Sequence, residues 1–546
     1  MISILLLITS CDEFMEPDRY SPREKWFQKQ LEIKKVEKLE QHEMITGLTQ
    51  KYDDLLERLS EKKETSVTKK VRKFLEDYNF KAAEKLVLDF LQSVKDEQSE
   101  FSYLDLAILQ ELQLDYSKAL YSYQKATELD PENPLYWYSL GMMEFQLGNY
   151  KSSLIDLNNA LGIALETLAP NHSNTALYRH SIGKAFLKLK KPDDAIVQIE
   201  KALEIATHKF PKNHPRIINN WKSLGKAYTI LGNDEKALQY FEQTLVASIE
   251  TYGPEAPNVS FAWSDIGDNS ISQGKYKKAV ESYENALQID RKFFGRKSPK
   301  VAMDWANLAV SWEMRGELEK SIEYTEKALQ SDIHTFGADH PRVATRRNNL
   351  GERYRKSGLY KKAIESFQKS ARSDIRSYGV KSADVATVLN NIGLAYSGLG
   401  KHERAIKYFR KALASDVETY GSKHPDVAKV FFNIAKEWNS LGRHQRAIKY
   451  FKRALKSDTL TYGSEHPNVA IYWIKIGDSW IMEKQYKIAV GYYGKAFDSF
   501  KKNLGEKHPK TISVERSFLR AKLLLSMELT NKESSSIKAK VPTTAR

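Results

Sequence analysis

The sequence has little cysteine and no long apolar run. Its 546 residues include a single cysteine, Cys11, so internal disulfides and zinc sites built from several cysteines are excluded. The most apolar stretch covers only residues 2–8, well short of the roughly 18 residues that a transmembrane helix needs. Phosphate-binding glycine loops, nucleophile elbows and metalloprotease motifs are missing too. We therefore expect no enzymatic activity, no cofactor and no bound metal.

Small residues, in contrast, recur with one spacing through most of the chain. Glycines stand every 42 residues from Gly253 to Gly505, and a second series of Gly or Ala runs from Gly141 to Gly477 with the same period. Apolar residues make up 41% of the sequence, which is enough for a folded core. A fixed period of this length predicts a solenoid of stacked helical repeats.

Each repeat reads as an antiparallel pair of helices. In residues 338–379, Pro341 stands where a helix can begin without losing a hydrogen bond. Gly351 and Ala363 are small where the two helices cross, with axes about 8–10 Å apart. Gly379 can adopt the left-handed conformation that ends the second helix. One pair cannot bury its apolar face alone, so neighbouring pairs are expected to stack.

This pattern resembles the tetratricopeptide repeat. Residues 100–133 have its common 34-residue form, and residues 134–505 are similar to the 42-residue repeats of kinesin light chain, in which a His-Pro dipeptide precedes the first helix. The resemblance implies an all-α, right-handed superhelical solenoid of helix-turn-helix repeats that binds other proteins. The repeat at 380–421 has Ser382 and Ala383 in place of His-Pro, so we expect its first helix to begin less sharply.

The sequence divides into segments with different expected structures. These are a lipoprotein signal peptide at 1–11, a tether with an N-terminal helix or coiled coil at 12–65, the repeat array at 66–505, a capping helix at 506–529 and a disordered tail at 530–546.

The first residues carry a second resemblance. Ile8-Thr9-Ser10-Cys11 resembles the lipobox of bacterial lipoproteins, in which the cysteine carries a diacylglycerol. No Lys or Arg precedes Cys11, although signal peptides normally open with a positive charge. The resemblance implies a lipid-anchored protein of the bacterial cell envelope. The alternative is an incidental cysteine in a cytoplasmic protein.

An apolar stripe precedes the repeats. It consists of Ile45, Leu48, Tyr52, Leu55 and Leu59, spaced by three or four residues as on one face of a helix. Such a stripe can form a short coiled coil, and the chain would then be a dimeric organiser of an envelope assembly. Alternatively, the stripe packs against the first repeats of its own chain.

A second stripe consists of asparagines, which lie two residues before the small residue of the first helix. Its members are Asn307, Asn349, Asn391 and Asn433, with Asn348 and Asn390 beside two of them. In tetratricopeptide arrays the first helices line the concave surface, so the resemblance implies that these amides face a groove. An amide both donates and accepts hydrogen bonds, which suits the backbone of an extended peptide. The alternative is that the amides bond within the solenoid.

Positive charge is concentrated in the same region. The net charge is +15, and the repeats from 338 to 463 account for all of it. Arg355, Lys429 and Lys436 fall at positions that can face the groove, which predicts a preference for acidic peptides. The alternative is that most of these charges lie on the solvated outer face. A nucleic-acid partner is not expected, because the basic residues show no clear pattern of interleaved aromatics.

Histidines also follow the period. His172, His214, His340, His424, His466 and His508 lie at multiples of 42 residues. Packed helices are about 8–10 Å apart, whereas zinc requires nitrogens about 2 Å from one ion. We therefore expect each histidine to serve the start of its own first helix.

Overall fold

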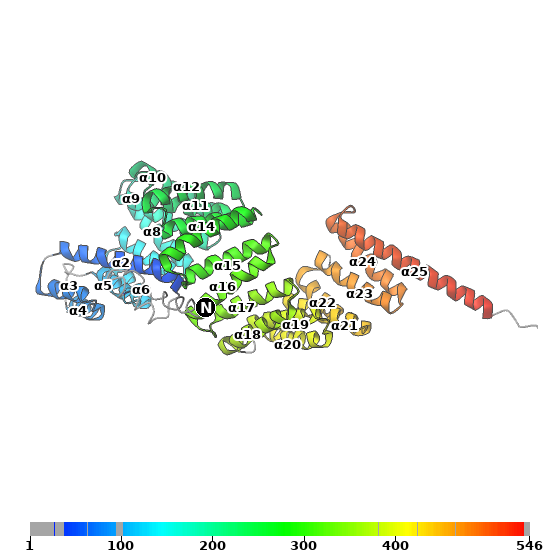
Figure 1. The fold of residues 1–546 in the computed structure, drawn as a ribbon. Helices are drawn as coiled ribbons and strands as arrows, with labels where there is room; N and C mark the ends of the chain where they lie inside the picture. Colours follow the sequence, from blue (N-terminus) through cyan, green and yellow to red (C-terminus); the bar gives the residue numbers. More distant parts are fainter. Residues whose placement is uncertain are drawn as a thin grey trace, which may run out of the picture. The chain divides into compact units, whose positions relative to one another are not determined.

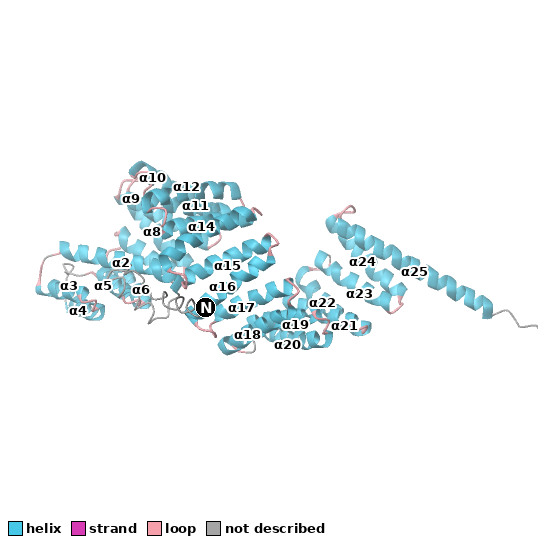
Figure 2. Cartoon of the chain, viewed as in Figure 1, coloured by secondary structure: helices cyan, strands magenta, loops and turns pink. Residues whose placement is uncertain are grey.

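The computed structural model describes residues 27, 38–62, 64–93, 102–379, 382–422, 424–464 and 466–539. Cys11 and the expected signal peptide lie outside these residues. In the part of the chain that is described, all regular structure is helical and no strand occurs (Figure 2). The all-α fold expected from the sequence is confirmed. None of the described helices is long and apolar enough to cross a membrane.

The chain forms two compact units, Met1–Arg315 and Gly316–Arg546. The helices of the first unit are α2 (Lys38–Glu61), α3 (Ser66–Glu76), α4 (Phe80–Ser93), α5 (Tyr103–Leu112), α6 (Tyr116–Leu129), α7 (Pro134–Gln146), α8 (Tyr150–Thr167), α9 (Ser173–Lys188), α10 (Pro192–Lys209), α11 (Pro215–Ile230), α12 (Asp234–Tyr252), α13 (Pro257–Ser272), α14 (Tyr276–Phe294) and α15 (Pro299–Met314).

The second unit continues the same alternation of helices (Figure 1). Its helices are α16 (Leu318–Phe336), α17 (Pro341–Lys356), α18 (Tyr360–Tyr378), α19 (Ala383–Gly398), α20 (His402–Tyr420), α21 (Pro425–Ser440), α22 (His444–Tyr462), α23 (Pro467–Met482), α24 (Tyr486–Leu504) and α25 (Pro509–Ala539).

Each repeat contains a shorter first helix and a longer second helix. In the second unit the first helix α17 packs on its own second helix α18, and α18 then packs on the next first helix, α19. Successive first helices also approach each other, as α17 does α19 and α19 does α21, whereas successive second helices approach less closely. The second helices therefore lie on the wider, outer side of the stack.

The two helices of a repeat meet at a residue without a side chain. A Cβ atom added to Gly393 would lie 2.5 Å from the ring of Phe409 on the second helix, and one added to Gly351 would lie 2.6 Å from the ring of Phe367. Both phenylalanines are fully buried. The small residue predicted from the period is therefore what allows an aromatic ring to fill the space between the helices.

The histidines cap the first helices, as expected. In His340 the ring Nδ1 accepts a hydrogen bond from the backbone N–H of Arg342 at 3.1 Å, and the ring stacks on Phe336 with centroids 4.8 Å apart. The same Nδ1 cap occurs at His172, His214, His424 and His508. The cap satisfies one of the free N–H groups at the helix start, and the stacking ties it to the preceding second helix.

The repeat at 380–421, which has neither His nor Pro at this point, has a first helix that begins just as sharply. The hydroxyl of Ser382 accepts a hydrogen bond from the backbone N–H of Asp384 at 3.2 Å, and α19 starts at Ala383. The expectation of a less sharp start is therefore wrong. Serine is among the best residues for capping the N-terminus of a helix, so it replaces the histidine in this role.

The N-terminal apolar stripe packs inside its own chain. Leu48, Tyr52, Leu55 and Leu59 on α2 are almost completely buried, in one core with residues of α3, α4 and α5. Charged contacts support this packing, since Arg58 on α2 pairs with the buried Asp105 of α5 at 3.0 Å. Of the two alternatives for the stripe, packing against the first repeats is the one observed.

The C-terminal helix is longer than expected. We predicted a capping helix at 506–529 and a disordered tail from 530, but α25 runs to Ala539. Between Lys510 and Ala539 the sequence contains neither proline nor glycine, so no residue breaks the helix there. Val514 and Ala521 of α25 are buried against the last repeat, as a cap requires.

We predict that the contact at Gly393 is sensitive to a single methyl group. Gly393→Ala should destabilise the protein by about 1–3 kcal/mol, because the added Cβ overpacks the site against Phe409. The matched control is Gly491→Ala on the exposed surface of α24, where nothing lies within 4 Å of the added Cβ. The control should stabilise slightly, since alanine favours helix more than glycine does. Urea unfolding followed by circular dichroism measures both, and equal effects would contradict the packing argument.

Candidate functional site

The asparagines of the second unit form a ladder across the first helices. The Nδ2 of Asn391 on α19 donates to the Oδ1 of Asn348 on α17 at 3.0 Å. One repeat further, the Nδ2 of Asn433 on α21 donates to the Oδ1 of Asn390 on α19, also at 3.0 Å. The sequence placed these asparagines at equivalent positions, and the structure shows that adjacent repeats are joined through them.

The ladder leaves hydrogen-bonding capacity unused. An asparagine amide has two N–H donors and an oxygen with two lone pairs, and each of these bonds uses one donor or one lone pair. Asn391 and Asn433 are half-buried, so part of each amide is open to solvent. The first-helix face, which we define as the surface of α17, α19 and α21, therefore presents regularly spaced donors and acceptors.

Two asparagines of the stripe are placed differently. Asn349 on α17 is exposed, and within the described part of the chain its backbone carbonyl, not its side chain, accepts a hydrogen bond from Arg353. Asn307 lies on α15, in the first unit, and is half-buried. The ladder of the second unit is therefore formed by Asn348, Asn390, Asn391 and Asn433.

Two of the three cations predicted for the groove are already paired. The Nε of Arg355 donates to Glu352 at 2.8 Å, and this hydrogen bonding raises the pKa of Arg355. The Nζ of Lys429 donates to Asp426 at 2.8 Å, which likewise raises its pKa. Lys436 is exposed on α21. Of the three, Lys436 is the most readily available to an acidic ligand.

Comparison with known proteins agrees with the repeat architecture. The family model described as "Tetratricopeptide repeat" matches residues 134–208, 216–292, 259–330, 301–376 and 384–458, and a model described as "TPR repeat" matches residues 115–148. Together these matches cover more than half of the chain. The chain belongs to the tetratricopeptide-repeat family.

Solved structures with similar repeats are also found. A Podosopora anserina protein with nearly identical TPR-like repeats of the kinesin light chain type is 18% identical, with a TM-score of 0.36, over 38% of this chain and 98% of its own. BtubC (BKLC) from P. vanneervenii is 22% identical, with a TM-score of 0.36, over 43% of this chain and 91% of its own. No curated protein matches the chain. The family assignment rests on the family models.

The charge of this tetratricopeptide-repeat protein does not follow the asparagine ladder. On α17, α19 and α21 the exposed cations are Lys356, Lys429 and Lys436. The second helices of the same repeats, α18, α20 and α22, carry fourteen exposed Lys or Arg side chains. Most of the positive charge predicted for the groove therefore lies on the other side of the solenoid.

A further periodic series was not predicted from the sequence. It consists of buried aspartates near the ends of the second helices. Its members are Asp290, Asp332, Asp374, Asp416 and Asp458, each at most 6% exposed. They are 42 residues apart, so the signal was available in the sequence as a recurring acid after a small or apolar residue. Each aspartate faces the start of the following first helix. Burying a carboxylate costs free energy unless the group is paired. The stability of each contact therefore depends on which side chains lie next to the aspartate.

The partners of these aspartates differ between repeats. The Nε of Arg346 donates to Asp332 at 2.9 Å, and Arg342 lies 3.6 Å from its other oxygen. In the two following repeats the position of Arg342 is taken by an acid, Asp384 or Asp426. Burial, together with Asp384, raises the pKa of Asp374 to about 6, and burial, together with Asp426, raises the pKa of Asp416 to about 6.

The first unit contains a more crowded version of this contact. The ammonium group of Lys300 lies 2.6 Å from Asp290 and 2.8 Å from Asp304, and all three side chains are buried. Burial raises the pKa of Asp304 to about 8, despite the neighbouring Lys300. The cluster joins α14 to α15, so it plays the same structural part as the Asp332 pair.

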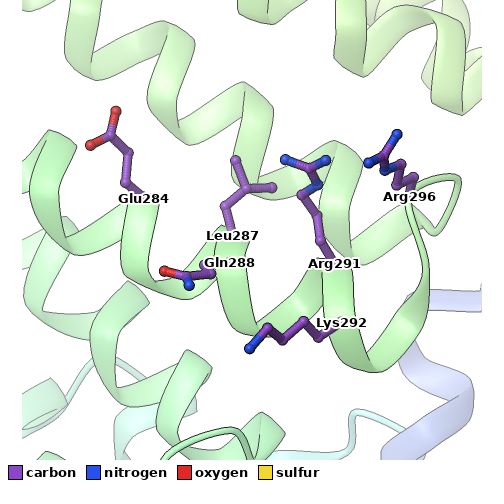
Figure 3. A pocket seen from close by; sticks show the side chains of 6 residues that line it. All are labelled: Glu284, Leu287, Gln288, Arg291, Lys292 and Arg296. Carbon is purple, nitrogen blue, oxygen red and sulfur yellow. The ribbon is translucent and has the colours of Figure 1, made fainter.

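A surface hollow on the first unit shows no recognisable set of catalytic residues. It has a volume of about 440 Å³ and is lined by Glu284, Leu287, Gln288, Arg291, Lys292 and Arg296 (Figure 3). Every lining side chain comes from α14 or from the turn that follows it. Among the described residues there is also no group of three His, Cys, Asp or Glu side chains able to hold a metal ion.

We predict opposite effects of removing two equivalent aspartates. The neutral form of Asp416 is favoured in the folded state, so its contribution to stability is fully present below about pH 4 and is lost as the pH rises through about 6. Asp416→Asn should therefore raise the melting temperature at pH 7.5 by a few degrees, and the gain should shrink as the pH falls from 6 to 4.

Asp332→Asn is the matched control. It should lower the melting temperature at pH 7.5, because Arg342 and Arg346 lose a carboxylate in a buried site. Thermal unfolding of the full-length protein, followed by circular dichroism at pH 7.5 and at pH 4, measures the effect of each substitution. If the melting temperature rises equally in both variants, Arg342 and Arg346 do not stabilise the charged form of Asp332.

Proposed function

We propose that the first-helix face of the second unit binds the backbone of an extended peptide. Tetratricopeptide repeats serve as scaffolds for protein–protein interaction, and the family assignment makes this the general role of the chain. The observation that carries the more specific proposal is the ladder, in which amides recur at the same place in successive repeats with the same 3.0 Å bond.

The spacing of the ladder suits an extended chain. Neighbouring packed helices lie about 8–10 Å apart, and an extended peptide rises about 3.3 Å per residue. Every third peptide residue would then meet a new rung. The unused donors and acceptors of Asn391 and Asn433 can bond a peptide N–H and C=O, which makes this mode of recognition independent of the side chains of the peptide.

The preference for acidic side chains is expected to be modest on this face. An acidic residue of the peptide would have to compete with Glu352 for Arg355 and with Asp426 for Lys429. Lys436 is exposed and lies one turn after Asn433 on α21. An acidic residue near that rung is therefore the side-chain feature that we expect in a good ligand.

The ladder variants test this proposal. Peptides selected from a random library on the full-length protein would be titrated against Asn391→Ala/Asn433→Ala. Loss of a desolvated hydrogen bond costs about 1–3 kcal/mol, so affinity should fall at least five-fold. The matched control is Asn158→Ala/Asn159→Ala, two exposed asparagines on α8. If affinity is unchanged in the ladder variant, the peptide site lies elsewhere.

We further propose that the protein is tethered to a membrane through Cys11. The proposal rests on Ile8-Thr9-Ser10-Cys11 and its likeness to a lipobox. A single acyl chain binds a bilayer only weakly, whereas two or more give stable anchoring. A diacylated cysteine would therefore hold the repeat array at the surface of a bacterial membrane.

The tether has a direct chemical test. Expressed in a bacterial host with labelled palmitate, the full-length protein should take up the label and fractionate with membranes. Cys11→Ala should lose both properties, while the repeat array should melt at the same temperature. Uptake of label by Cys11→Ala would place the lipid elsewhere, and a wild-type protein without label would refute the tether.

A further inference from the structure

The second-helix face of the second unit is strongly basic. We define it as the exposed surface of α18, α20 and α22. It carries fourteen exposed Lys or Arg side chains but only three exposed acids, Glu365, Glu403 and Glu418. A surface with so little internal neutralisation attracts anionic partners.

The remaining acids of these helices cannot neutralise the surface. Asp374, Asp416 and Asp458 are at most 6% exposed and lie at the contact with the following first helix. Of the exposed cations, Lys369 pairs with Glu365 at 2.8 Å and Arg376 pairs with Asp339 at 2.6 Å. The positive field therefore remains on the outer side of the stack.

The cations are arranged in two columns that follow the repeat. One column consists of Lys362, Arg404 and Arg446, and the other of Lys369, Lys411 and Arg453. Members of the two columns are seven residues apart on one helix, which is two turns, so they point to the same side. Within a column the step from one repeat to the next is wider than the roughly 8–10 Å between directly packed helices, because successive second helices approach each other less closely than successive first helices do.

Aromatic rings hold several of these cations in place. Lys411 lies over the ring of Tyr408 at 5.5 Å and Arg453 lies over the ring of Tyr450 at 5.5 Å. In the other column Arg446 lies over the ring of Trp438 at 4.8 Å. Because cations cover these rings, the rings are not free to stack with the bases of a single-stranded nucleic acid.

We propose that this second-helix face binds an extended acidic polypeptide, at a site separate from the first-helix face. An extended chain rises about 3.3 Å per residue, so acids at every third or fourth residue can reach successive members of a column. The second helices lie on the outer, convex side of the stack. A flexible chain can follow a convex surface over several repeats, whereas a rigid duplex or a flat bilayer meets it only over a small area. One protein can then hold two ligands, one on each face.

The test uses a labelled peptide of repeated Glu-Gly-Ser triplets, long enough to cross three repeats, with the full-length protein. Fluorescence anisotropy should show binding that weakens as salt rises, since exposed charges are screened beyond about 8 Å at physiological ionic strength. The corresponding Gln-Gly-Ser peptide should not bind. Absence of binding by the acidic peptide at low salt would overturn the proposal.

Variants then locate the site. Loss of four exposed charge pairs in Arg404→Gln/Lys411→Gln/Arg446→Gln/Arg453→Gln should weaken binding about ten-fold. The control Lys151→Gln/Lys188→Gln/Lys201→Gln/Lys209→Gln removes the same charge from exposed sites of the first unit, and it should leave affinity within about two-fold. Circular dichroism of each variant verifies that the fold is retained.

Three further outcomes would overturn the proposal. Equal weakening by the two variants would mean attraction to net charge alone. Weakening by Asn391→Ala/Asn433→Ala would place the acidic peptide on the first-helix face. Tighter binding of a single-stranded oligonucleotide or of anionic vesicles, lost in the column variant, would assign the surface to a different class of partner.

Discussion

The structure depends on the close approach of two helices within each repeat. At Gly351 and Gly393 the first helix comes so near to the second that only a phenylalanine ring fits between them. This contact sets the angle and the distance of the pair, and stacking copies of one pair produces the solenoid. A wider crossing would shift every later first helix, and the amides that meet across repeats would no longer be within hydrogen-bonding distance.

The polar contacts between adjacent repeats differ from one repeat to the next. The apolar contacts are nearly the same from repeat to repeat, whereas Asp332 is paired with two arginines and Asp416 is influenced by the acid Asp426 as well as by Lys429. Adjacent repeats are therefore joined with different strengths, although their backbones are alike. Because repeat proteins are stabilised by intrinsic and nearest-neighbour terms, we expect the contacts at Asp374 and Asp416 to be weaker at neutral pH than the contact at Asp332.

The two sides of the second unit have different chemistry. The first-helix face presents amides, and two of its expected cations, Arg355 and Lys429, are held by neighbouring carboxylates. The second-helix face carries most of the exposed charge. Amides select a backbone conformation through directed hydrogen bonds, whereas exposed charges attract a class of partner with little directional demand. This separation supports a scaffold that uses its two faces for different ligands.

The period, the helix pairs, the small residues at the crossings and the histidine caps were all predictable from the sequence, because each depends on residues close together in one repeat. The contacts between repeats were not. Asn391 meets Asn348 from 43 residues away, and whether an amide bonds to its neighbour or faces solvent depends on how one first helix is rotated against the next. The same rotation decided that most lysines and arginines lie outside the predicted groove, and that Asp416 is buried near Asp426. For the apolar stripe on α2 the sequence allowed either a coiled coil or packing against the first repeats. Only the tertiary structure shows that the stripe packs against α3, α4 and α5.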